Sequence, residues 1–471
     1  MQVEFIPSNK GAPKLVVAGF FFRRVRSINL TRYWRCCDMQ CKATAVTEGE
    51  LLSKEPLANA HEHLMPTRDI NVAKIKASMK ATVRVQHVGI KRTYDAALRE
   101  LTQNVAVDNL PAVLAEQPEY DSIRSSVLRT RLAKYPPMPT TREAINFDGE
   151  YSRTEGGQRF LLHHDNNIVI FASDEALQLV SASDIILLDG TFNSSPALFY
   201  QLYTIHGRVL GQIAPLVYAL LPNKEKFTYR RLFEVVRHEL GARGLVWNPE
   251  RILIDHELAA LQALRVIFPG KIINTCLFHF CQCILRKVNA IGMKTLYEQN
   301  EEVRLWVRKM MAMALAPLPT FAFQQNGAIP TIWQAIMDRI PAFITEEMKD
   351  ALLSYLWQTW CDPENAMFHP VVWTHYNTTD IRTTNNVEAW HRVLNAEAGS
   401  HSPNIYRAVQ ILKTQERQTS IRHAQLQNGG AVNVRRSKWI KVDQKIQRIK
   451  ALYELGELPI GQFLRAMAYL V

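Results

Sequence analysis

Three short apolar runs in the middle of the chain constrain its fold more than any other feature. Two of them are followed directly by an aspartate: 185–188 by Asp189, and 252–254 by Asp255. The third run is 272–273. Runs this short that are apolar throughout are typical of strands buried on both faces of a sheet. A helical pattern follows Asp255, so the region predicts an α/β layer.

Prolines and tryptophans indicate how the chain divides around this centre. The segment 135–139 contains three prolines, which cannot continue a helix, so it predicts a boundary. Five of the nine tryptophans fall within 300–375, which predicts a helical subdomain with a small core of its own, inserted at about 295–375. We expect four segments: a strand-rich module over 1–69, a helical DNA-binding or linker region over 70–140, the α/β core over 141–400 and a basic helical region over 401–471.

The net charge of +12 is concentrated at the two ends of the chain. Residues 1–47 carry eight basic residues against two acids, and residues 401–450 carry eleven against two. Basic arms around a slightly acidic centre suit a polyanion that the ends hold and the centre processes, because Lys and Arg displace condensed counterions from a phosphate backbone. A basic excess that serves only solubility is the alternative.

Cysteine usage and hydropathy indicate the compartment. The seven cysteines cluster at 36–41 and 276–283, with Cys361 apart, which indicates metal binding or reduced thiols and not a secreted disulfide framework. The apolar run 15–22 is followed by arginines where a cleavage site should lie, so it is not a secretion signal. No apolar run reaches the roughly 20 residues that span a bilayer. We expect a soluble, intracellular protein that makes no membrane contact.

The aspartates at the two strand ends are candidate metal ligands. Open α/β sheets place their ligand sites beyond the strand ends, so neighbouring strands would bring Asp189 and Asp255 together. Two carboxylates at close range repel each other unless a cation lies between them, and oxygen ligands favour Mg²⁺ or Mn²⁺. Either aspartate taken alone is more simply explained as a turn residue or a helix cap.

A third acid favours the metal site over these simpler explanations. Glu388 follows Thr and Asn residues that cap helices well, so we expect it in the first turn of a helix with a buried apolar stripe. A glutamate at that position is also favoured by the helix dipole alone.

The order of these motifs resembles the Mutator-like element (MULE) transposases. The sequence has Asp-Gly-Thr-Phe beginning at Asp189, a strand ending at Asp255, Cys-Leu-Phe-His at 276–279 and Asn-Asn-Val-Glu ending at Glu388. The resemblance covers about 150–400 and implies a ribonuclease H-like core, which is a mixed sheet flanked by helices, with a helical insertion ahead of the glutamate. It also implies a DDE triad of these three acids that binds Mg²⁺ or Mn²⁺. One ion would activate water or a DNA 3′-hydroxyl, and the other would stabilise the departing oxygen.

Cys276 and His279 match the CxxH signature of that family. With Cys281 and Cys283 close by, four soft ligands within eight residues could hold zinc. The spacing fits a strand-to-helix turn packed against the core at least as well, because cysteine is commonly a small buried hydrophobe. We favour the structural role for Cys281 and Cys283 and leave the role of Cys276 and His279 open.

The first 69 residues contain a second candidate metal site. Cys36, Cys41, His61 and His63 provide the two thiolates and two imidazoles of a zinc set, in a module small enough to depend on the ion for stability. The pattern resembles the FLYWCH zinc finger over about 15–64, and Cys37 is a surplus thiol that could replace Cys36. A small β module with coincidental histidines is the other interpretation. Basic residues around the site point to DNA as the partner, with protein as the alternative: Arg23, Arg24, Arg26, Arg32, Arg35 and Lys42.

Basic residues alternate with apolar ones at near-helical spacing from Arg435 to Lys450. Such a helix could hold phosphates or act as a nuclear localisation signal. A solvated helix face is the alternative.

Together these features predict a transposase-like protein that cleaves DNA and transfers strands at transposon ends, with zinc-finger DNA binding and a nuclear location. A domesticated DNA-binding transcriptional regulator without catalytic activity is the alternative. A plain nuclease would share the acidic site but would lack strand transfer. The expected partners are transposon ends or regulatory DNA, and a second copy of the chain in a homodimer.

Overall fold

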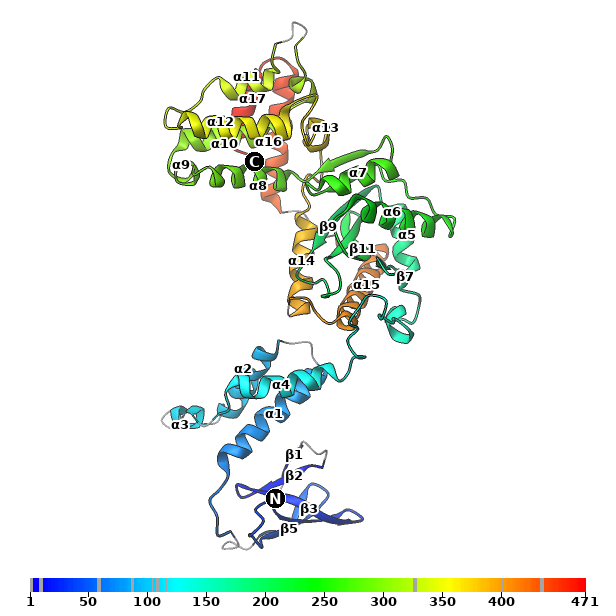
Figure 1. The fold of residues 1–471 in the computed structure, drawn as a ribbon, viewed down its shortest axis with the longest axis vertical. Coiled ribbons are helices and arrows are strands. Elements are labelled where there is room, and N and C mark those ends of the chain that lie inside the picture. The colour runs from blue at the N-terminus through cyan, green and yellow to red at the C-terminus, as the bar shows by residue number, and fades with distance from the viewer. Residues whose placement is uncertain are drawn as a thin grey trace. The chain divides into compact units, whose positions relative to one another are not determined.

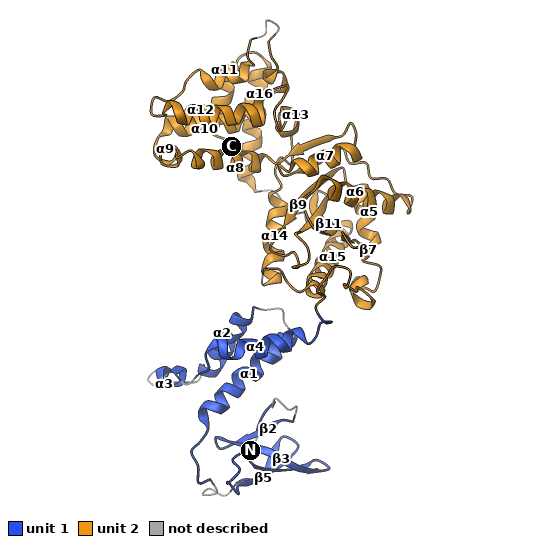
Figure 2. Ribbon diagram, in the orientation of Figure 1, with its two compact units in different colours: residues 1–137 blue, residues 138–471 orange. Residues whose placement is uncertain are grey.

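The computed structural model consists of two compact units, Met1–Pro137 and Met138–Val471 (Figures 1 and 2). The division falls inside the proline-rich segment 135–139. The structure describes residues 3–7, 12–56, 61–85, 89–103, 105–106, 110–115, 117–324, 328–399, 401–432 and 436–471.

The first unit begins with a six-stranded antiparallel sheet whose strands are adjacent in sequence order. The strands are β1 (Glu4–Ile6), β2 (Lys14–Val17), β3 (Phe20–Ile28), β4 (Thr31–Cys36), β5 (Thr44–Glu48) and β6 (Leu51–Lys54). Trp34 and Cys36 of β4 are buried while Arg35 between them is exposed, as expected for alternating faces of a strand. The indole of Trp34 donates a hydrogen bond to Thr47 Oγ1 at 2.9 Å.

Helices complete the first unit. They are α1 (Thr67–Val85), α2 (Ile90–Thr102), α3 (Leu110–Ala115) and α4 (Tyr120–Leu132). Ile75, Met79 and Val83 are spaced four residues apart on α1, and this stripe packs against Tyr94 of α2 and Val127 of α4. The helical periodicity that the sequence shows here therefore corresponds to a real packing face.

The second unit is built on a seven-stranded mixed sheet with the order β13-β12-β9-β10-β11-β8-β7. Its strands are β7 (Leu161–His164), β8 (Val169–Phe171), β9 (Ile185–Thr191), β10 (Gln201–Val209), β11 (Gln212–Leu221), β12 (Arg251–Ile254) and β13 (Ile272–Thr275). β9, β10 and β11 form an antiparallel meander, whereas β12 is parallel to β9 and β13 is parallel to β12. The carboxyl ends of β9, β12 and β13 therefore lie at one edge of the sheet.

Helices cover both faces of this sheet (Figure 1). Ile186 and Ile252 belong to a core shared with α5 (Asp174–Ala182), α6 (Lys226–Gly241) and α7 (Leu258–Ile267). Leu187 and Leu253 point to the opposite face, where they cluster with Val387 of α14 (Asn385–Ala398). The long helix α15 (Ile405–Gln427) packs along β11 and α14. The apolar runs are thus buried on both faces, as their composition predicts.

The segment between β13 and α14 is helical and contains the tryptophan-rich region. It comprises α8 (Leu277–Ala290), α9 (Lys294–Gln299), α10 (Glu301–Ala312), α11 (Thr331–Met337), α12 (Glu346–Leu356), a π-helical turn (Trp357–Cys361) and α13 (Pro370–Trp373). These helices pack mainly on one another, and their core is continuous with that of the sheet, because Trp306 and Trp373 belong to the same buried cluster as the sheet. Phe280 and Ile284 of α8 belong to that cluster as well.

The C-terminal region completes this helical layer. Its last two helices are α16 (Ser437–Glu454) and α17 (Ile460–Met467). Phe463 and Met467 of α17 are fully buried, and α17 packs on α10 and α11. The C-terminal residues are therefore part of the core of the second unit.

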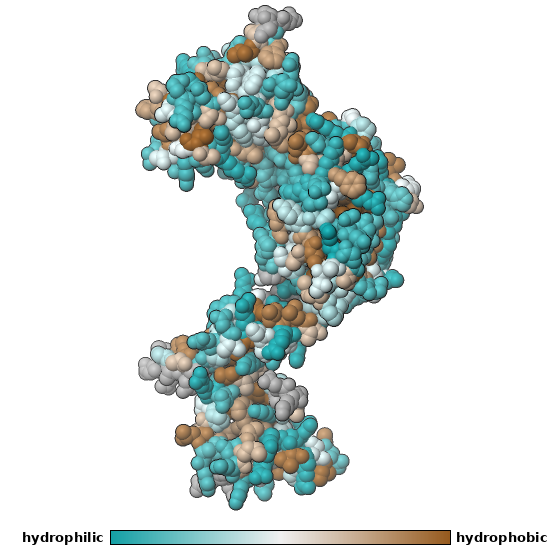
Figure 3. All heavy atoms as spheres, in the orientation of Figure 1, coloured by the Kyte–Doolittle hydropathy of each residue, from teal (hydrophilic) through white to brown (hydrophobic). Residues whose placement is uncertain are grey.

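The surface shown in Figure 3 is predominantly hydrophilic, with hydrophobic residues in scattered groups. Within the described part of the chain, no helix has both the length and the apolar character needed to cross a bilayer.

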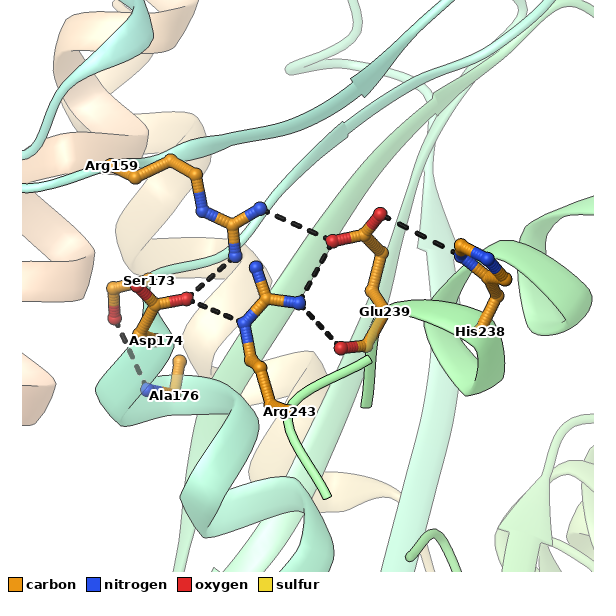
Figure 4. Close-up of polar contacts among 7 residues, drawn as sticks. All are labelled: Arg159, Ser173, Asp174, Ala176, His238, Glu239 and Arg243. Carbon is orange, nitrogen blue, oxygen red and sulfur yellow. Dashed lines mark hydrogen bonds and ion pairs between the residues drawn. The ribbon is translucent and has the colours of Figure 1, made fainter. Parts of the chain in front are cut away.

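A network of four charged side chains holds α5 and α6 together (Figure 4). Arg159 and Arg243 each contact both Asp174 in the first turn of α5 and Glu239 on α6, at distances of 2.6 to 3.2 Å. Although partial burial opposes the effect, hydrogen bonds from the two arginines lower the pKa of Asp174. Ser173 caps the same helix by accepting a hydrogen bond from the Ala176 amide at 3.1 Å.

We expect Arg243→Met to lower the free energy of unfolding by about 1 kcal/mol, because it removes two ion pairs of a partly buried network. The matched control is Arg230→Met, which removes one exposed pair with Glu234 on α6 and should cost less than about 0.5 kcal/mol. Urea unfolding followed by circular dichroism measures both changes. Equal losses would show that the network has no special role.

Candidate functional site

Cys36, Cys41, His61 and His63 converge in the first unit, where their four ligand atoms all lie within 4.8 Å of one another. Cys36 Sγ lies 3.3 Å from His63 Nε2, and Cys41 Sγ lies 3.3 Å from His61 Nδ1. The two imidazole nitrogens are 3.2 Å apart. A tetrahedral zinc ion with Zn–N near 2.0 Å and Zn–S near 2.3 Å separates its ligand atoms by roughly 3.3 to 3.8 Å. The four residues fit a zinc ion.

The sheet determines which of the two adjacent thiols faces this cluster. Cys36 is buried at the end of β4, and burial together with the nearby Cys41 raises its pKa to about 11. Two thiolates here would therefore need a cation. The ring of Phe20 stacks on His61 with centroids 3.6 Å apart. Cys37 points elsewhere and packs beside Phe21, so it does not take the place of Cys36.

We expect Cys41→Ser to abolish stoichiometric zinc in the purified protein, since a tetrahedral site loses one of its two sulfur ligands. Cys37→Ser is the matched control and should retain the full zinc content, because its side chain packs outside the cluster. Atomic emission on the two variants and the parent gives the answer. Zinc loss in the Cys37 variant would contradict the assignment of ligands.

The three acids come from β9, from the end of β12 and from α14. Asp255 directly follows β12, as the apolar run predicts, and Glu388 lies in the first turn of α14. Asp189 does not end its strand, because β9 continues to Thr191 by pairing with β10. The sequence shows only where the apolar run stops, whereas the backbone pairing extends past it.

Strand register brings the two aspartates together. Leu253 of β12 pairs with Leu187 of β9, and the same register continued by two residues sets Asp255 beside Asp189. Side chains at these positions share the face of the sheet that α14 covers. His391, one turn after Glu388 on α14, lies 3.4 Å from Asp189 with its Nδ1 facing Oδ2. The helix that carries Glu388 therefore packs over the aspartate pair.

The aspartate pair is electrostatically costly. Burial and the charge of Asp189 raise the pKa of Asp255 to about 7. Its Oδ1 atom has no exposed surface and no hydrogen-bond partner in the structure. Glu388 instead contacts His279, with 3.2 Å between Oε1 and Nε2. Within the residues that the structure describes, only the Cys36 cluster gathers three or more metal-type ligands, so the three acids do not share one tight ligand sphere.

The turn 276–279 connects Asp255 and Glu388. The Cys276 amide donates to the carbonyl of Ile254 at 2.7 Å, directly before Asp255. The Thr384 amide, at the start of α14, donates to Cys276 Sγ at 3.3 Å. Burial raises the pKa of Cys276, but hydrogen bonding and the positive charge of His279 lower that pKa by more. The CxxH residues therefore join the strand of one acid to the helix of another.

The protonation of His279 depends on the thiol and the carboxylates around it. Burial opposes protonation, but Cys276 and the carboxylates of Asp255 and Asp189 raise the pKa of His279 to about 9. Cys281 and Cys283 pack against the core, and burial raises the pKa of Cys281 to about 12. In the described part of the chain, no metal-type cluster forms from the residues of 276–283.

Three neighbours of the acids, Glu257, His391 and Lys224, were not anticipated from the sequence. Glu257 lies two residues after Asp255, where it pairs with Lys224 at 3.0 Å and accepts a hydrogen bond from the Tyr229 hydroxyl. His391 lies three residues after Glu388, on the same side of α14. Helical spacing from Glu388 could have indicated His391. Lys224 had no sequence signal, because it reaches the site from the turn after β11.

In magnesium-free buffer, Asp255→Asn should stabilise the protein above pH 7. A carboxyl whose pKa is 3.8 when unfolded and about 7 when folded destabilises the fold increasingly as the pH rises through that interval. The difference corresponds to at most about 4 kcal/mol. Thermal unfolding between pH 5 and pH 8 tests this against Asp350→Asn, which removes an exposed carboxylate from α12. Parallel pH profiles for the parent and the Asp255 variant would contradict the expected repulsion.

Comparisons with known families agree with this geometry. Residues 185–283 match the MULE transposase domain, and residues 5–63 match the FLYWCH zinc finger domain. The chain thus carries both of the domains that the sequence motifs resemble. The first match includes Asp189, Asp255 and the CxxH turn and ends before Glu388, while the second includes all four cluster residues of the first unit. A comparison with curated proteins finds no match.

Proposed function

We propose that this chain is a DNA transposase that cleaves DNA and transfers strands at transposon ends, with Asp189, Asp255 and Glu388 as its DDE triad. The observation that carries the proposal is the buried Asp189–Asp255 pair within a MULE transposase domain, because its repulsion is relieved only by a proton or a cation. The third acid is carried by the helix that packs over this pair.

A ribonuclease H-like core for 141–400 is part of this proposal. It is supported by a mixed sheet with helices on both faces and by helices inserted between β13 and the helix of the third acid. The FLYWCH finger and the helical segment 70–140 are then accessory regions of the chain, whereas the C-terminal helices α15 and α17 pack into the second unit itself.

The residues at the acidic edge fit Mg²⁺ or Mn²⁺. Asp255 offers a carboxylate oxygen without a hydrogen-bond partner, and hard divalent ions take oxygen ligands. Such ions, when bound, activate a water or 3′-hydroxyl nucleophile and stabilise the departing oxygen of the phosphodiester. Within the protein, His391 would orient Asp189, and His279 would balance the charge of Glu388.

We further propose that the FLYWCH finger binds DNA through its arginine-rich strands. Arg23 of β3 and Arg35 of β4 are exposed and directly opposite each other, a like-charge pair that costs stability unless an anion binds there. Arg26 lies 4.3 Å from the ring centre of Tyr33. None of these three arginines makes an ion pair among the described residues, so their charge is available to phosphates.

The C-terminal basic helix and the cellular location complete the proposal. Lys441, Lys445 and Arg448 are exposed on α16, whereas Lys450 is buried and donates to the carbonyl of Tyr376. Arg435 lies outside the described residues. We propose that the exposed residues support DNA binding in the nucleus, and that a homodimer brings two DNA ends together.

The experiment is Mn²⁺-dependent nicking of supercoiled plasmid by the full chain. Asp189→Asn and Glu388→Gln should each reduce nicking by at least about 100-fold, because a metal ligand is lost. The control Asp350→Asn removes an exposed acid from α12 and should nick at the parent rate. DNA affinity, measured by fluorescence anisotropy on each protein, should stay within about twofold of the parent.

Two outcomes would overturn the enzyme assignment. Nicking that persists in both triad variants would place the activity elsewhere. If the parent is inert on plasmid and on its cognate transposon ends yet binds them through the finger, the chain is a DNA-binding regulator without catalytic activity.

A further inference from the structure

The connection between β9 and β10 begins three residues after Asp189 and has an ordered backbone. The Ser195 amide donates to the carbonyl of Phe192 at 3.2 Å, and the Phe199 amide donates to the carbonyl of Pro196 at 2.9 Å. The Tyr200 amide donates to the carbonyl of Leu221 on β11 at 2.8 Å. These bonds give the connection a defined shape beside the acidic edge.

The three aromatic residues of this connection are used differently. Phe199 is buried and packs as an ordinary core residue, with 6% of its surface exposed. Phe192 and Tyr200 remain 43% and 54% exposed, with ring centres 5.4 Å apart and ring planes at 77°. Large aromatic side chains normally gain stability by burial, so an exposed pair held on an ordered connection favours a binding role.

A lysine links this aromatic pair to the acids. Lys224 Nζ lies 4.9 Å from the ring centre of Phe192 and pairs with Glu257, two residues after Asp255. The ammonium group therefore contacts both the Phe192 ring and a carboxylate that lies two residues from Asp255.

We propose that Phe192, Tyr200 and Lys224 form a subsite for an unstacked nucleobase and its phosphate beside the acid pair. The inference rests on the proposed DNA-processing function and identifies which feature of the DNA the core recognises. Aromatic faces bind bases of any sequence by stacking, and a lysine with three donors can hold a phosphate oxygen while it keeps its contact with Glu257. A fully paired duplex presents no free base face to such a subsite.

Duplexes that carry one 2-aminopurine test this subsite. The base is either paired with thymine or placed opposite an abasic position, and every protein is the full chain with Glu388→Gln, so that cleavage cannot alter the probe. We expect the unpaired probe to bind at least fivefold more tightly, as base stacking of about 1 to 3 kcal/mol implies. Its fluorescence should be quenched on binding.

Matched variants distinguish base stacking on this aromatic pair from a nonspecific change in DNA affinity. Phe192→Ala and Tyr200→Ala should bring the affinity ratio close to one, whereas Phe192→Trp should retain it. Phe343→Ala removes another exposed aromatic side chain from the helical region and should leave the ratio unchanged. Equal affinity of the unsubstituted background for the two probes, or a ratio that survives Phe192→Ala, would overturn the subsite.

This result is independent of the nicking assay. A chain that nicks DNA through its acids but shows no preference for the unpaired base lacks the subsite and keeps the proposed function. A chain that shows the preference without metal-dependent nicking keeps the subsite and loses the proposed enzyme activity.

Discussion

The parallel pairing of β12 with β9 is the constraint on which the second unit depends. Parallel strands end at the same edge of a sheet, and the observed register, continued by two residues beyond Leu253 and Leu187, sets Asp255 beside Asp189. That arrangement places two carboxylates where burial opposes their charge. The helices on both faces keep the strands in this register, because the apolar side chains of β9 and β12 are buried against them.

The turn at 276–279 links this edge of the sheet to the helix that carries the third acid. Cys276 binds the backbone before Asp255 and accepts a hydrogen bond from the start of α14, while His279 contacts Glu388. A small buried thiol suits this position, because its sulfur accepts a hydrogen bond from the Thr384 amide while the Cys276 backbone amide bonds to Ile254. The CxxH motif can therefore be understood as a structural connection between two acids that are 133 residues apart in sequence.

The first unit has a small core and depends on other interactions for its stability. Its sheet has a core of only a few large side chains, so the convergence of two thiols and two imidazoles adds a metal site to a module that buries little apolar surface. The charge repulsion between Arg23 and Arg35 is tolerated on its surface. The buried core residues and the exposed arginines thus lie on opposite sides of the same strands.

Local pattern in the sequence was sufficient to predict the strands that lead to Asp189 and Asp255, the helix that begins near Glu388, the stripe on α1 and three of the four residues of the zinc cluster, Cys41, His61 and His63. These features depend on periodicity and on chemically distinctive side chains, which are readable over a few residues. Tertiary structure alone decided that the sheet and the tryptophan-rich helices share one continuous buried cluster, that Cys36 and not Cys37 faces the zinc cluster, and that Lys224 approaches the acids. Those outcomes depend on register and on contacts between segments far apart in the chain, and no local pattern encodes them.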